Sequence, residues 1–105
     1  MARWVLATTL DRLVEGIPLL VSVEGEDVAV FRVGDEVYAI DDLCSHAQAS
    51  LSEGEQRGYI IACPQHGGKF DIRSGRATRF PAVSSVRCYP VRLEGNAVLI
   101  DAEAW

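Results

Sequence analysis

The hydrophobic positions of the first 40 residues fall into short runs rich in β-branched and aromatic side chains, separated by turns of glycine and acidic residues. This pattern predicts a first strand over residues 3–8, followed by a hairpin or meander. The strands of that meander are expected at residues 19–23, 28–33 and 36–40. Residues 11–16 predict one helical turn, because a glycine such as Gly16 commonly ends a helix.

The pattern changes after residue 40. Residues 41–58 follow neither the period of a strand nor that of a helix, which indicates a long loop or short turns. Beyond this loop the chain returns to short strands joined by tight turns, several of which contain glycine. We expect these later strands at residues 59–62, 69–72, 76–78, 86–93 and 97–101.

The sequence contains no repeat, no low-complexity segment and no linker, and a length of 105 residues suits one domain. We therefore predict a single all-β domain of about nine short strands over residues 1–105. Because the strand-rich segments lie at both ends, residues 1–40 and 81–105 are expected to form a basal barrel or sandwich. Residues 41–80 would then form a small lobe inserted between its two halves.

Charge and composition narrow the range of partners. The net charge of −5 argues against binding nucleic acid, because a phosphate backbone requires a basic face. The charge is uneven: residues 44–80 hold five basic and three acidic residues, whereas the rest of the chain holds five basic and twelve acidic ones. The N-terminus does not resemble a signal peptide, and no apolar run approaches the length of a membrane span. We expect a cytoplasmic protein that does not enter a membrane.

The strongest chemical signal is the position of the histidines. The chain has only two, and each stands beside a cysteine, in Cys44-Ser45-His46 and in Cys63-Pro64-Gln65-His66. Cysteine in a reducing compartment more often serves a metal or catalysis than a disulfide. Structural zinc sites usually take two cysteines from one half of the motif and two histidines from the other. Here each half supplies one thiolate and one imidazole, which favours a two-iron cluster, while a zinc-stabilised interaction module stays open as an alternative.

The residues around these pairs resemble the Rieske proteins. The matching stretches are Asp42-Leu43-Cys44-Ser45-His46, Leu51-Ser52-Glu53-Gly54 and Cys63-Pro64-Gln65-His66-Gly67-Gly68-Lys69-Phe70-Asp71. The resemblance implies a Rieske-type fold of three stacked antiparallel sheets, with one [2Fe–2S] cluster at the tip of the inserted lobe. It also implies that Cys44 and Cys63 hold the buried iron, while His46 and His66 hold the outer one.

The chain departs from the respiratory, high-potential branch of that family at four positions. Respiratory Rieske proteins carry an extra cysteine in each ligand loop, where this chain has Ala49 and Gln65. They also carry a serine and a tyrosine whose hydroxyls bond the cluster sulfurs, where this chain has Gly68 and Phe70. Hydrogen bonds to sulfur stabilise the reduced cluster, so their loss predicts a potential in the lower part of the Rieske range.

A small chain with these features looks like the Rieske-type ferredoxin of a multicomponent aromatic-ring-hydroxylating dioxygenase, a system of aromatic hydrocarbon catabolism. The resemblance implies a carrier that takes electrons from a flavin-containing NAD(P)H-dependent ferredoxin reductase and passes them singly to a terminal Rieske oxygenase. No catalytic constellation remains once the four ligands are assigned, so we expect an electron-transfer component rather than an enzyme. The alternative within the family is a Rieske-like small subunit of a larger enzyme such as nitrite reductase.

Overall fold

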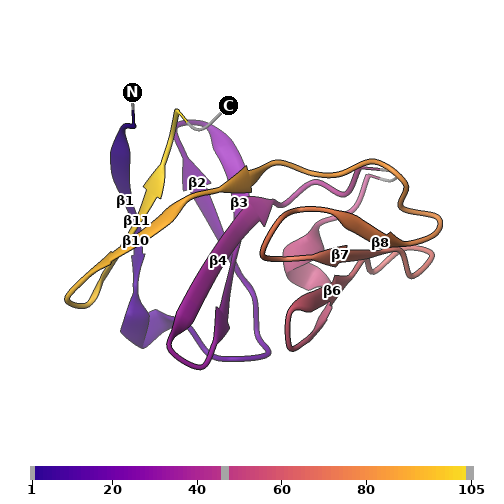
Figure 1. Cartoon of the computed structure of the whole chain (residues 1–105), viewed down its shortest axis with the longest axis horizontal. Helices are drawn as coiled ribbons and strands as arrows, with labels where there is room; N and C mark the ends of the chain where they lie inside the picture. Colours follow the sequence, from indigo (N-terminus) through magenta and orange to yellow (C-terminus); the bar gives the residue numbers. More distant parts are fainter. Residues whose placement is uncertain (1, 46–47, 104–105) are drawn as a thin grey trace.

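The computed structural model describes residues 2–45 and 48–103, and over these residues the chain forms eleven strands in three antiparallel sheets (Figure 1). The prediction of an all-β fold with three antiparallel sheets is confirmed. The first sheet contains β1 (Trp4–Thr9), β11 (Ala97–Asp101) and β10 (Val91–Glu94), in that order. The second contains β2 (Leu19–Val23), β3 (Glu26–Val33), β4 (Glu36–Asp41) and β9 (Cys88–Tyr89). The third contains β5 (Glu55–Arg57), β6 (Ile60–Ala62), β7 (Lys69–Asp71) and β8 (Ala77–Arg79).

The second sheet is the middle layer, and its strand β3 is buried on both faces. Val28 and Val30 point to one side and join the apolar cluster that contains Ile100 of the first sheet. Ala29 and Phe31 point to the other side and join the cluster that contains most of the buried side chains of the third sheet. This two-sided burial explains why the middle of β3, residues 28–31, is a continuous apolar run rather than an alternating one. Figure 1 shows the same arrangement, with the first and third sheets on opposite sides of β3 and β4.

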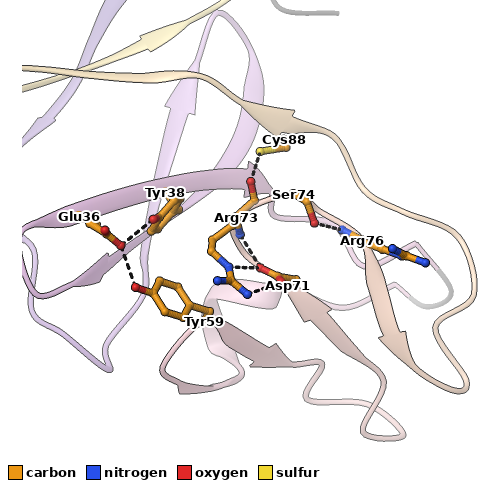
Figure 2. Close-up of polar contacts among 8 residues, drawn as sticks. All are labelled: Glu36, Tyr38, Tyr59, Asp71, Arg73, Ser74, Arg76 and Cys88. Atoms are coloured by element: carbon orange, nitrogen blue, oxygen red, sulfur yellow. Dashed lines mark hydrogen bonds and ion pairs between the residues drawn. The ribbon is translucent and has the colours of Figure 1, made fainter.

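A cluster of polar side chains fixes the third sheet against the second (Figure 2). The hydroxyls of Tyr38 on β4 and Tyr59 in the β5–β6 turn both donate to the same carboxylate oxygen of Glu36, at 2.7 and 2.9 Å. The guanidinium of Arg73 lies 4.2 Å from the centre of the Tyr59 ring and binds Asp71 through two nitrogens. The hydrogen bonds lower the pKa of Glu36 and raise the pKa of Tyr38 to about 12.

Two strand predictions were wrong, and proline explains the first of them. The strand expected over residues 86–93 is split at Pro90, so that β9 pairs with β4 and β10 pairs with β11. Pro90 has no backbone N–H to continue a ladder, but its carbonyl oxygen accepts a hydrogen bond from the Asp101 N–H at 3.1 Å. The chain therefore changes sheets at this residue.

The second error is a missed strand within residues 41–58, where we expected a long loop or short turns. That segment contains a 3₁₀ turn, η2 (Leu51–Glu53), and the strand β5. Only Gln56 of β5 is buried, so the strand carries no apolar alternation that a sequence pattern could reveal. The helical turn expected at residues 11–16 is a 3₁₀ turn that begins one residue earlier, η1 (Leu10–Arg12).

Within residues 2–45 and 48–103 there is no helix with the length and apolar character to span a bilayer.

The close approach of backbone at Gly54 yields a stability prediction. A Cβ atom at Gly54 would overlap the carbonyl oxygen of Ala62, which is backbone and cannot turn aside. Gly54→Ala should therefore lower the free energy of unfolding by about 3 kcal/mol, as overpacking against a rigid neighbour does. Gly58→Ala is the matched control, because Gly58 has a φ of +60° but open space around it. Its cost should be about 1 kcal/mol from the left-handed backbone alone.

Urea unfolding of both variants measures the two free energies. A Gly54→Ala variant no less stable than Gly58→Ala would contradict this account of the β5–β6 packing.

Candidate metal centre

The first of the two loops with cysteine and histidine begins where β4 ends, and Asp42 closes it. The buried Asp42 carboxylate accepts a hydrogen bond from the Ser52 N–H at 2.8 Å and another from the Ser50 hydroxyl. Inside this closure the Cys44 N–H donates to the Ala49 carbonyl at 3.0 Å. These bonds bring residues 49–52 back beside residues 42–44 and fix the backbone at Cys44. Sequence reasoning singled out the cysteine but assigned no role to Asp42, Ser50 or Ser52.

The second loop is the tight connection between β6 and β7. The Cys63 N–H donates to the Gly68 carbonyl at 2.7 Å, directly beyond the paired residues Ala62 and Lys69. His66 and Gly67 both adopt positive φ, at 68° and 72°. That conformation is rare for a residue with a side chain, and it is the kind of local strain that clusters at functional sites. His66 is exposed to solvent at the turn.

The structure brings the two cysteines into one buried cluster. Cys44 and Cys63 are each 3% exposed, and both belong to the apolar cluster that contains Phe70 of the third sheet and Phe31 of the second. The predicted ligands thus divide into two buried thiols and one exposed imidazole. His46, the fourth predicted ligand, lies outside the described residues.

This donor set fits a two-iron cluster better than a single ion. Zinc would need its four ligands around one centre. A Rieske cluster needs only two protein ligands per iron, both cysteines on one and both histidines on the other. Buried thiols and a solvent-facing imidazole match that division.

A third loop, between β8 and β9, covers the pair of ligand loops. Ala82 is buried in the same cluster as Cys44 and Cys63, and its N–H donates to the Arg79 carbonyl at 3.1 Å. The Ser45 hydroxyl donates to the Ser84 carbonyl at 2.6 Å, which ties this loop to the first ligand loop. The sequence offered only Pro81 as a hint of this loop.

An open hollow of about 780 Å³ lies beside the first ligand loop, and an ion-pair cluster forms part of its wall. Arg87 binds Asp41 and Glu26 at 3.0 Å each, and the Tyr89 hydroxyl donates to Asp41 at 2.7 Å. These bonds raise the pKa of Arg87, and burial together with the bond to Asp41 raises that of Tyr89. Among the predicted ligands that the structure describes, Cys44 lines this hollow, which therefore adjoins the first ligand loop.

The third cysteine lies apart from this centre. Cys88 on β9 is half-buried, and its thiol donates to the Arg73 carbonyl at 3.4 Å (Figure 2). Burial raises the pKa of this thiol, which keeps it protonated at neutral pH.

Known proteins are similar to this chain in sequence and in fold. The model of the Rieske [2Fe-2S] domain matches residues 3–90. The ferredoxin component of the naphthalene 1,2-dioxygenase system of Pseudomonas aeruginosa is 42% identical over 94% of this chain and 95% of its own length.

Two solved structures add to this. The ferredoxin of carbazole 1,9a-dioxygenase from Nocardioides aromaticivorans IC177 superposes with a TM-score of 0.92 at 43% identity, covering 95% of this chain and 98% of that one. A second similar chain belongs to the complex of reduced oxygenase and oxidised ferredoxin in carbazole 1,9a-dioxygenase. It superposes with a TM-score of 0.89 at 34% identity, covering 95% of this chain and 94% of that one. The cofactor of the family is the Rieske [2Fe–2S] cluster, and these relatives are electron-transfer components of dioxygenase systems. The chain belongs to the Rieske [2Fe–2S] family, among the ferredoxin components of aromatic-ring-hydroxylating dioxygenase systems.

Proposed function

We propose that this chain holds one [2Fe–2S] cluster through Cys44 and Cys63 on the inner iron and His46 and His66 on the outer iron. The observation that carries the proposal is the burial of both cysteines in one apolar cluster while His66 faces solvent. The cluster would sit at the tip of a lobe formed by residues 41–80, inserted between the basal segments 1–40 and 81–105. When bound, it supplies reversible one-electron transfer.

The protein's own residues set the conditions for that transfer. The buried position of Cys44 and Cys63 keeps water away from the thiolates. Two neutral imidazoles in place of two further thiolates make the centre less negative, which raises its potential above that of a four-cysteine ferredoxin. The exposed side chain of His66 gives a partner a short route to the outer iron. The same residues thus protect one side of the centre and open the other.

The partners follow from the family. We propose that a flavin-containing NAD(P)H-dependent reductase supplies the electrons and that a terminal Rieske oxygenase receives them one at a time. The complex of oxygenase and ferredoxin in the carbazole system supports the second step. Because NAD(P)H is generated and consumed in the cytoplasm, we place the carrier there.

The charge of the lobe supports an encounter with an acidic partner surface. Of the five basic residues of this segment, Arg57 is paired with Glu55 and Arg73 with Asp71. Lys69 and Arg79 lie opposite each other on β7 and β8, and in the described part of the chain neither forms an ion pair. Two like charges in register are unfavourable within a sheet, and an anionic partner would relieve that repulsion.

Substitution of the histidine ligands tests the assignment. His46→Ala and His66→Ala should each abolish the visible absorption of the Rieske cluster, because the outer iron loses one of its two protein ligands. Cys88→Ala is the control and should keep the full spectrum and iron content, because its thiol bonds to the Arg73 carbonyl. A normal spectrum in either histidine variant, or loss of the cluster in Cys88→Ala, would overturn the assignment.

The departures at Gly68 and Phe70 generate a prediction about potential. Both positions are buried, so bulk water would not compete for the hydrogen bonds of hydroxyl groups placed there. Gly68→Ser combined with Phe70→Tyr should raise the midpoint potential by tens of millivolts, because each hydroxyl can donate to a cluster sulfur and stabilise the reduced state. A rise of about 59 mV corresponds to a tenfold change in the one-electron equilibrium.

Redox titration measures this potential, and Gly68→Ala is the control because it adds a Cβ without a donor. An unchanged or lower potential in the double variant with the cluster intact would contradict the hydroxyl explanation, as would an equal rise in Gly68→Ala.

A further inference from the structure

The loop between β8 and β9 exposes two large apolar side chains close together in sequence. Phe80 is 79% exposed and Val83 is 75% exposed. A single exposed apolar residue is common on any protein surface. Two within four residues, on a loop whose Ala82 is buried against the cysteines, form a surface that the fold itself does not use.

Both side chains border the end of the molecule where electrons must leave. β7 and β8 are antiparallel with Lys69 opposite Arg79, so Phe80 continues the strand to the level of Gly68, two residues from His66. At the other end of the loop, Val83 adjoins Ser84, whose carbonyl accepts the hydrogen bond from Ser45 of the first ligand loop. The loop therefore runs from one ligand loop to the other. Figure 1 shows the segment after β8 turning at the end of the lobe remote from the first sheet and then returning to β9.

The loop is held in place before any partner arrives. The Ala82 N–H donates to the Arg79 carbonyl at 3.1 Å, and the Val86 N–H donates to the Gly75 carbonyl at 2.9 Å. With Ala82 buried between these bonds, the backbone has little freedom left to lose on binding. Such preorganisation improves affinity because less ordering entropy opposes association.

We propose that Phe80 and Val83 are the apolar anchors by which this chain docks on the terminal oxygenase, a claim that rests on the proposed function. The matching surface on the oxygenase would be an apolar depression with an acidic rim, beside its electron-accepting centre. The apolar part would receive Phe80 and Val83, and the rim would face Lys69 and Arg79, which lie just before this loop in the β7–β8 pair. The oxygenase is the chosen occupant because a relative with the same fold is solved in complex with one.

The two kinds of contact act on different steps of binding. Charges that steer an encounter chiefly change the association rate and lose their effect as salt screens them. Apolar side chains buried in the complex chiefly slow dissociation, and added salt does not screen them. The loss of affinity caused by removing the Phe80 side chain should therefore persist at high ionic strength. The faster association due to Lys69 and Arg79 should disappear there.

The test uses the full-length, cluster-loaded protein and the terminal oxygenase of carbazole 1,9a-dioxygenase from Nocardioides aromaticivorans IC177, whose own ferredoxin is 43% identical to this chain. The variants are Phe80→Ser and Val83→Ser. Ile17→Ser is the matched control, since Ile17 is 64% exposed but lies between η1 and β2, outside the third sheet and the ligand loops. Each protein is reduced chemically, freed of reductant and mixed anaerobically with the oxygenase at low and high salt.

Phe80→Ser should raise the dissociation constant of the complex with the oxygenase about 10-fold or more at both salt concentrations. Val83→Ser should raise it by a smaller factor, because an isopropyl group buries less apolar area than a phenyl group. The cluster spectrum and the thermal unfolding midpoint should be unchanged, because both side chains are exposed. Ile17→Ser should bind like the wild type.

The proposal is wrong if Phe80→Ser and Val83→Ser bind the oxygenase as the wild type does, or if Ile17→Ser weakens binding equally. It is also wrong if the variants bind the oxygenase normally and only their reduction by a flavin reductase slows. A wild-type chain that neither binds nor reduces the oxygenase would instead defeat the proposed function, and the docking surface with it.

Discussion

The structure depends on one buried cluster of apolar side chains, which stabilises the fold and also holds the two cysteines that we propose as iron ligands. Cys44 and Cys63 pack among the same side chains, including Phe31 and Phe70, that join the third sheet to the central one. Because interiors are close-packed, the positions of the two thiols are set by the contact between the lobe and the basal part. Within the two loops, the hydrogen bonds of Asp42 and of the Cys63 N–H add to this packing by holding the backbone near each cysteine.

From this constraint follows the asymmetry of the site. In the proposed site the thiols enter from the core side, which leaves the side of the exposed His66 for solvent and partners, and the loop carrying Phe80 and Val83 lies beside the first ligand loop. The hydrogen bond from Tyr59 to Glu36 crosses from the third sheet to the second, whereas the ion pairs of Arg87 lie within the second sheet and the segment that precedes β9. We interpret the contact between Tyr59 and Glu36 as one that keeps the lobe in one orientation, so that a partner meets the same face at each encounter.

The all-β fold class could be predicted because turn signals are local in sequence, whereas the three-sheet arrangement was implied by the resemblance to the Rieske proteins. Strand β11, at Ala97–Asp101, was predicted to the residue because its apolar run follows a turn that contains glycine and ends at an aspartate. What failed depends on distant partners. β5 exists because its backbone pairs with β6 although only Gln56 is buried, and the split at Pro90 depends on which sheet edge is open at that point. The roles of Asp42 and of the β8–β9 loop likewise arise from contacts that no spacing rule encodes.

The central claim is that two histidines and two cysteines divide between the two irons. Electron paramagnetic resonance of the dithionite-reduced protein, with nuclear double resonance on samples containing ¹⁵N-labelled histidine, tests it most directly. The account predicts a paramagnetic signal coupled to nitrogens from two histidines, because the added electron resides on the iron that they hold. A protein that stays silent after reduction, or a cluster signal without histidine nitrogen coupling, would contradict it.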